Sequence, residues 1–200
     1  MTDSPPGKIV PDTNYSDVLD FWFGPPEARG KARPEWFRKD GKFDAEVRRR
    51  FGELHARAAR RELETWRTSP EPMLALAIVL DQFSRNLYRN DARAFAQDEY
   101  ARECAREAIA RGDDLGLLPV ERQFVYMPFE HSEDRVDQDL AVDLMLSLEA
   151  FDETRGLAEW ARKHRVIVQR FGRFPHRNAV LGRATTAEEA EFLKRPGSGF

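Results

Sequence analysis

Apolar residues recur at helical spacing through most of the chain, which predicts a protein built of α-helices. No segment alternates apolar and polar residues over the length of a strand. Two segments in the second half show the helical pattern most clearly, with stripes at Val136, Leu140, Leu144, Leu148 and Phe151, and then at Leu157, Trp160, His164, Ile167 and Phe171. We expect helices over residues 16–24, 43–68, 70–86, 92–111, 119–131, 136–151, 157–171 and 186–193.

Turn residues divide these helices into antiparallel pairs. Ser69 and Pro70 form a typical helix start, Gly112 a typical end, and Pro128 should kink or end its helix. The short connections predict hairpins over 44–86, 92–131 and 134–173. The fold class is therefore all-α, with stacked antiparallel helical hairpins in a tetratricopeptide-like arrangement, although the tetratricopeptide signature residues are absent.

The length of 200 residues fits one domain, which we place at residues 14–194. Proline and glycine near both ends predict a flexible N-terminus at 1–13 and a flexible tail at 195–200. The single cysteine, Cys104, excludes an intramolecular disulfide and fits a reducing compartment. Neither a long apolar run nor a secretory signal is present, so we expect a cytoplasmic protein with no membrane partner.

Charge is unevenly distributed, although the formal net charge is only −3. Residues 129–153 carry nine acidic side chains and one basic, whereas residues 155–183 carry eight basic and one acidic. Neighbouring blocks of opposite charge are expected to neutralise each other across a helix pair. Because a nucleic-acid surface requires an unopposed basic patch, the pattern argues against nucleic acid as a partner.

The first segment with unusual polar residues ends the most apolar helix. Asp81 and Arg85 are one helical turn apart, and Asn86 follows directly. A carboxylate on so apolar a helix requires a partner, and Arg85 is the obvious one. This pair either stabilises the helix end or places Arg85 and Asn86 in a binding pocket.

The second segment is FVYMPFEHSE at residues 124–133. Glu130, His131 and Glu133 bring two carboxylates close to an imidazole at a helix end, just after a proline. A nearby carboxylate raises the pKa of a histidine, which would suit His131 for proton transfer. The alternative is that these residues only cap neighbouring helices. We treat all three as candidate catalytic residues.

The third segment, FGRFPHRNAVLGR at residues 171–183, gives the strongest signal. It combines basic side chains with an amide, as expected for a site that binds carboxylate or phosphate: Arg173, His176, Arg177, Asn178 and Arg183. His176 adds a fourth candidate catalytic residue, and the others are candidate ligand-binding residues. Because little acid is nearby in sequence, Arg173 and Arg177 should form positive charge that an anion relieves. Alternatively, these side chains neutralise the acidic helix.

Metal and cofactor motifs are absent from the sequence. His164 lies on the apolar stripe of its helix, where a histidine is usually a hydrogen-bonded core residue. His131, His164 and His176 fall in the same half of the chain, but they lack metal-ligand spacing. We therefore expect neither a metal nor a cofactor.

Five blocks of the sequence resemble a bacterial protein family of unknown function. The blocks are DFWFG (20–24), LDQFSRN (80–86), FVYMPFEHSE (124–133), RFGRFPHRNAVLGR (170–183) and TTAEEAEFL (185–193). The resemblance implies a tetratricopeptide-like all-α fold and no particular activity. Ser84 stands where the family usually has proline, so the helix should continue more smoothly to Arg85.

Two classes of function fit these observations. The first is a small-molecule binding protein or enzyme that holds an anionic ligand, carrying phosphate or carboxylate, in a pocket of arginine, histidine and glutamate. The second is an interaction module for a protein or peptide, in which the arginine-rich segment is structural. The polar segments exceed what helix packing requires, which favours the first. The sequence determines neither the ligand nor the oligomeric state.

Overall fold

The computed structural model describes residues 13–199, and this part of the chain contains helices and no strand. The all-α prediction is therefore confirmed. The expected flexible N-terminus lies, except for Thr13, outside the described residues. The α-helices are α1 (Tyr15–Phe23), α2 (Gly41–Ala59), α3 (Pro70–Ile78), α4 (Ser84–Leu87), α5 (Asp98–Arg111), α6 (Pro119–Glu130), α7 (Arg135–Leu146), α8 (Leu157–Phe171) and α9 (Ala187–Leu193).

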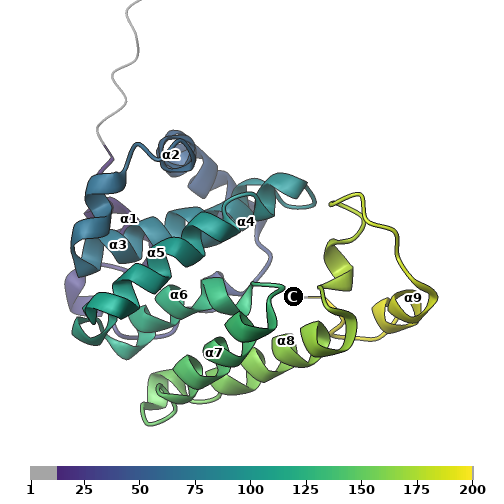
Figure 1. The fold of residues 1–200 in the computed structure, drawn as a ribbon. Coiled ribbons are helices and arrows are strands. Elements are labelled where there is room, and N and C mark those ends of the chain that lie inside the picture. Colours follow the sequence, from purple (N-terminus) through teal and green to yellow (C-terminus); the bar gives the residue numbers. More distant parts are fainter. Residues whose placement is uncertain (1–12, 200) are drawn as a thin grey trace, which may run out of the picture.

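Several helices that follow one another in the sequence pack together, and α6 packs against α7 as well as against α5. Helix α2 packs against the second half of the continuous helical run formed by α3 and α4, α5 packs against α6, and α7 packs against α8. Figure 1 shows α7 and α8 side by side along one edge of the molecule, with α9 beyond the end of α8. Helix α3 contacts α1, α5 and α6, so it forms the centre of the structure.

Aromatic residues from four parts of the chain form the core around this central run. Trp22 of the DFWFG block packs edge-on against Phe83 and Phe124, with ring centroids 5.6 and 5.4 Å apart. Trp36 lies 4.9 Å from the same Phe124. These contacts bury large apolar surfaces, which is the main favourable term in folding. The DFWFG block therefore has a structural role.

Several helix boundaries differ from the sequence expectation. Asn14, rather than Ser16, is the N-cap of α1, and its side chain accepts from Ser16 N. The expected helix 43–68 ends at Ala59, because Arg61 adopts a left-handed conformation (φ 60°), and a 3₁₀-helix follows at Glu64–Thr68. Helix α7 ends at Leu146, although its apolar stripe continues to Phe151. Pro128 lies inside α6, which continues to Glu130.

The central run contains a π-helical turn, η4 (Val79–Phe83), between α3 and α4. A π-turn has one extra residue in the turn, so it rotates the following side chains relative to a regular helix. The smooth continuation expected from Ser84 is therefore only partly correct. The Ser84 hydroxyl donates to Leu80 O at 2.6 Å across the π-turn.

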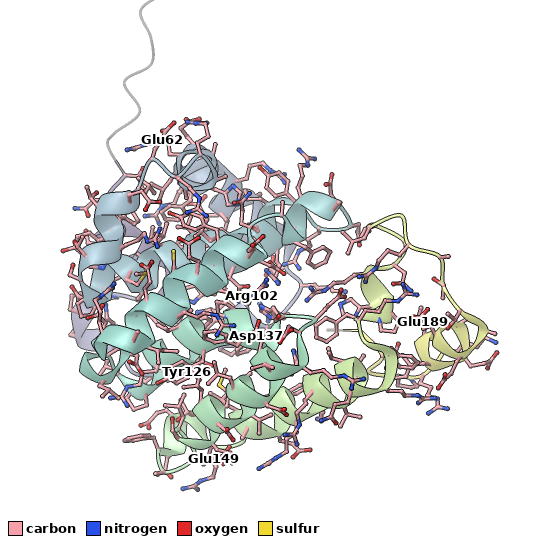
Figure 2. All side chains as sticks on the ribbon, viewed as in Figure 1. Glu62, Arg102, Tyr126, Asp137, Glu149 and Glu189 are labelled. Carbon is pink, nitrogen blue, oxygen red and sulfur yellow. The ribbon has the colours of Figure 1, made fainter. Side chains whose placement is uncertain are left out.

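Ion pairs attach α7 to α5. Asp137 in the first turn of α7 accepts from Arg106 and lies 3.4 Å from Arg102, as Figure 2 shows for Arg102 and Asp137. The Ser132 hydroxyl also donates to Asp137 at 2.7 Å. The two charge blocks neutralise each other in part: Arg155, Arg165 and Arg183 pair with acids of the acidic block, whereas the other arginines of the basic block have partners elsewhere.

The C-terminal part forms a small second core. Ile167, Val168 and Phe174 are buried together, with Phe171 and Phe192 packed against them. Residues 195–199 then turn back toward the η8 helix (Pro175–Arg177): a Cβ built on Gly199 would lie 3.5 Å from the Cβ of His176. Gly199 therefore lies close to η8, which follows the end of α8.

Candidate functional site

Four segments that are distant in sequence meet where α7, α8 and η8 adjoin the α1–α6 bundle. They are the η4–α4 run, the C-terminal end of α6, the first turn of α5 and the segment from Gly172 to Arg183. Each brings polar side chains into a largely buried region (Figure 2). The first, second and fourth are the three segments that the sequence singled out.

Asp81 is the centre of the first group of contacts. It is 1% exposed, and the Arg85 guanidinium lies 3.0 Å from its Oδ1. The same oxygen lies 2.8 Å from Nδ1 of His131, and the Gln82 amide donates to Oδ2 at 2.6 Å. The expected Asp81–Arg85 pair is thus present. The π-turn additionally directs Asp81 at His131, which the sequence could not show.

The charges in this group determine its protonation. Burial would raise the pKa of Asp81, but Arg85 and His131 outweigh it and hold the pKa well below its usual range. For His131, burial and the positive charge of Arg85 lower the pKa, although Asp81 opposes this. The raised pKa that the sequence predicted for His131 is therefore wrong, and the ring is neutral near pH 7. Its Nδ1–H donates to the ionised Asp81, so Nε2 carries the lone pair.

A second imidazole–carboxylate pair lies beside the first. His164 Nδ1 is 2.9 Å from Glu130 Oε1 and 3.0 Å from the carbonyl oxygen of Trp160. Because both neighbours are acceptors, Nδ1 of His164 carries the proton. The rings of His131 and His164 are 6.1 Å apart. Gln138 holds this end of α6 by donating to Glu130 O at 2.6 Å.

Two arginines share Asp98, which begins α5. Arg85 donates to both carboxylate oxygens of Asp98 at 3.1 Å, whereas Arg177 makes one longer contact of 3.5 Å. The central carbon of the Arg177 guanidinium lies over two aromatic rings, 4.5 Å from the centroid of Phe95 and 4.5 Å from that of Phe174. Arg177 is 6% exposed, and its Nε is buried without a hydrogen-bond partner among the described residues.

The pKa values near η8 reflect this burial. Burial and the neighbouring Arg85 lower the pKa of Arg177 to about 10. Burial and Arg177 likewise lower the pKa of His176 to about 4. The pKa of Arg85, in contrast, is raised, because the charges of Asp81 and Asp98 outweigh its burial. The positive charge of Arg177 is thus less well compensated than that of Arg85.

The remaining basic residues of the third segment hold its backbone in place. Arg173 makes two hydrogen bonds with Glu189 of α9, at 2.6 and 2.8 Å. Arg183 makes two with Glu133, at 2.6 and 3.0 Å, and Glu133 also accepts from Phe174 N at 2.7 Å. The positive charge expected at Arg173 is therefore already neutralised, because α9 supplies an acid that is distant in sequence.

Two amides have similar supporting contacts. Asn178, which is fully buried, donates to Glu189 at 3.2 Å and accepts from Arg183 at 3.0 Å. Asn86 donates to Asp44 of α2 at 2.8 Å, on another side of the helix from His131. The structure thus brings together Glu130, His131, Arg85, Arg177 and the adjacent His176. It places Asn86, Glu133, Arg173, Asn178 and Arg183 in contacts around them.

Sequence reasoning missed Asp98, Phe95 and Phe174 as parts of this cluster. Asp98 begins a helix, where acidic residues are common, so no sequence signal distinguishes it. His164 was considered a core residue, and its burial agrees with that, but its contact with Glu130 makes it part of the cluster. Among residues 13–199, no group of three or more histidine, cysteine or acidic side chains is placed to hold a metal ion.

These features define an all-α protein with a buried cluster of histidine–carboxylate pairs and arginines. The chain belongs to a family described as bacterial protein of unknown function (DUF924), whose model matches residues 18–197. It is also similar to the solved structure of the protein of unknown function ATU0120 from Agrobacterium tumefaciens. The identity is 44%, the TM-score is 0.78, and the match covers 90% of this chain and 96% of that one.

The chain matches none of the curated proteins with which it was compared. In the part that the structure describes, no helix is long and apolar enough to cross a membrane.

Proposed function

We propose that the cluster binds a small anionic molecule that carries a phosphate or carboxylate group, and that His131 exchanges a proton with it. Arg177 is the main anchor for the anion. The observation that carries this proposal is a buried guanidinium with an unpartnered Nε and one long ion-pair contact. Buried charges in proteins are normally paired and fully hydrogen-bonded, so the arrangement favours an additional anionic partner.

The aromatic contacts of Arg177 support this role. The guanidinium lies over the rings of both Phe95 and Phe174, and these contacts restrict its movement. An arginine held in this way is suited to bind two oxygens of a planar carboxylate or a phosphate. Arg85 is less suitable as an anchor, because Asp81 and Asp98 already occupy it.

The proton-transfer role of His131 follows from its contact with Asp81. The carboxylate fixes the ring and its tautomer, so Nε2 is the basic nitrogen. A histidine oriented by a buried aspartate is a common general base or acid in enzymes. His164, paired with Glu130, supplies a second imidazole close by. We propose that the protein acts in the cytoplasm, on a small molecule and not on nucleic acid.

Thermal melts with phosphorylated and carboxylated metabolites test the proposal. We expect at least one compound to stabilise the folded protein, by about 2.7 kcal/mol at a hundredfold excess over its Kd. Arg177→Gln should abolish this stabilisation, measured against the variant's own ligand-free melt. The matched control is Arg173→Gln, which removes an arginine that Glu189 already neutralises, and it should keep the ligand response.

Two results would contradict the proposal. One is that no anion raises the melting temperature of the native protein. The other is that Arg177→Gln and Arg173→Gln respond equally to a stabilising anion, because the anion then binds elsewhere. Either result would favour the protein- or peptide-interaction module, with the arginines as structural residues.

A further inference from the structure

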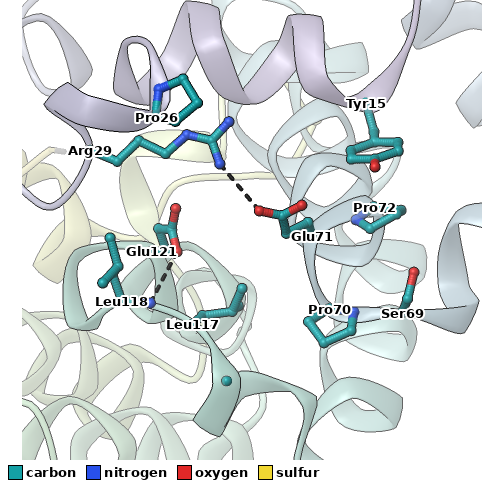
Figure 3. A pocket seen from close by; sticks show the side chains of 11 residues that line it. Tyr15, Pro26, Arg29, Ser69, Pro70, Glu71, Pro72, Leu117, Leu118 and Glu121 are labelled. Carbon is teal, nitrogen blue, oxygen red and sulfur yellow. Dashed lines mark hydrogen bonds and ion pairs between the residues drawn. The ribbon is translucent and has the colours of Figure 1, made fainter.

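A hollow of about 510 Å³ opens on the surface at the other end of α6 from the histidines (Figure 3). Helix α6 begins at this hollow with Glu121 in its first turn and ends at the cluster with Glu130. The other walls come from the start of α1, the loop after it and the start of α3. Its lining includes Tyr15, Arg29, Glu71, Leu117, Leu118 and Glu121.

The charged side chains in the hollow are predominantly acidic. Arg29 donates to Glu71 at 3.3 Å and, outside the hollow, to Asp20 at 2.9 Å. Glu121 is 6% exposed and accepts from Leu118 N at 3.0 Å through Oε2, which caps α6. Within the hollow, one guanidinium therefore faces two carboxylates, which leaves an excess of negative charge.

The geometry leaves acceptor oxygens directed at the hollow. Figure 3 shows the carboxylates of Glu71 and Glu121 on opposite sides, with Arg29 above them. Only one oxygen of Glu121 is occupied by the Leu118 amide. Burial raises the pKa of Glu121 by more than the Leu118 amide and Arg29 lower it, and the charge of Glu71 adds to the rise. A bound cation would relieve both effects.

Apolar groups form the rest of the wall. Tyr15 presents its ring, and Leu117 and three prolines supply aliphatic surface. Aromatic rings attract ammonium groups, and aliphatic walls accommodate a short alkyl chain. The volume lies within the range of about 300–1,000 Å³ that is typical of small-molecule sites.

We propose that this hollow is a second binding site, for a molecule with a primary ammonium group on a short alkyl chain. The ammonium lies between Glu71 and Glu121, and the chain lies against Tyr15 and Leu117. An anionic ligand is disfavoured, because Arg29 is already bound by two carboxylates. This inference does not depend on the function proposed for the histidine cluster.

Amide chemical shifts of the ¹⁵N-labelled full chain provide the test. The probes are n-butylammonium, n-butanol and butyrate, which are similar in size and differ in charge. We expect saturable shifts at residues 69–72 and 117–121 with n-butylammonium only. Glu71→Gln and Glu121→Gln should each raise its Kd at least about fivefold, as expected for a lost charge-assisted contact. Glutamine at 121 can still cap the helix.

The matched control is Glu99→Gln, an exposed glutamate in the first turn of α5, which should leave the Kd unchanged. Nα-acetyl-lysine methylamide distinguishes the two sources of an alkylammonium group. If this compound binds at least about tenfold more tightly than n-butylammonium, the ligand is a lysine side chain of a partner protein. If it binds less tightly than that, the ligand is a free amine. Equal binding of n-butanol, binding of butyrate, or an unchanged Kd in both glutamine variants would overturn the proposal.

Discussion

Asp81 connects more of the candidate site than any other single side chain. It contacts Arg85, His131 and Gln82, and it is almost completely buried. Removing Asp81 takes away the hydrogen-bond partner of His131 and one of the two carboxylates that neutralise the buried Arg85, which keeps only Asp98. We expect Asp81→Ala to reduce the free energy of unfolding by about 3–5 kcal/mol in urea melts.

The matched control for Asp81 is Asp152→Ala, whose carboxylate forms an exposed pair with Arg155. Exposed pairs contribute little to stability, so this variant should lose at most about 1 kcal/mol. Similar losses for the two variants would mean that burial does not strengthen the Asp81 contacts.

His55 provides a prediction of how the stability of the folded protein depends on pH. Its Nε2 lies 2.8 Å from the Ser84 hydroxyl, and this hydroxyl donates its own proton to Leu80 O. The Nδ1 of His55 is buried without a hydrogen-bond partner among the described residues. The ring is therefore neutral, and burial lowers its pKa to about 4. In the unfolded chain the histidine pKa is about 6.5. Between pH 6.5 and pH 4 the unfolded chain therefore binds a proton that the folded protein does not, so the stability of the folded protein falls as the pH falls.

Comparison with His55→Gln isolates this contribution. Between pH 6.5 and 4.5 the native protein should lose about 2–3 kcal/mol more stability than the variant, as measured by urea unfolding. Equal pH dependence of the two proteins would show that His55 titrates normally in the folded state.

At the scale of elements, one glycine determines where α8 ends and the third segment begins. Gly172 has a φ of 69°, in the left-handed region where a side chain is unfavourable. Gly172→Ala should therefore reduce stability by about 1 kcal/mol. Gly52 lies inside α2, and a Cβ there has no neighbour within 4 Å. Gly52→Ala should increase stability by about 0.5–1 kcal/mol.

The opposite signs are the essential part of this prediction, because the same chemical change is made at both positions. Denaturant melts of the two variants measure both effects. Stabilisation by Gly172→Ala would show that the backbone at this position can leave the left-handed region, and that the orientation of η8 does not depend on the glycine.

At the scale of the whole molecule, stability is unevenly distributed. Residues 73–78 of α3 are all buried, and all but Ala77 belong to the main core, whereas α9 packs on the small second core. Amide hydrogens exchange more slowly where opening requires global unfolding. Native-state hydrogen exchange should therefore be slowest in α3 and much faster in α9.

Arg173→Gln tests how α9 is attached. Loss of the two contacts with Glu189 should accelerate exchange in residues 187–193 and leave the protection of α3 unchanged. If protection of α3 falls to the same extent, α9 and the main core unfold as one cooperative unit.

Local patterns were sufficient for the fold class and most helices, because apolar spacing and caps act over a few residues. Helix α8 has the expected bounds, and the pairing of α7 with α8 follows from a short connection. The deviations have local backbone causes that the apolar pattern does not contain. The left-handed Arg61 and the π-turn at 79–83 are examples.

The candidate site was only partly predictable. The sequence identified three polar segments and the Asp81–Arg85 pair, since those residues are one helical turn apart. It could not show which polar side chains meet, because their partners are tens of residues away. Tertiary structure alone pairs Arg173 with Glu189, directs Asp81 at His131 and leaves Arg177 with its weak contact to Asp98. Burial and charge compensation depend on these distant contacts, and they determine which arginine remains available to a ligand.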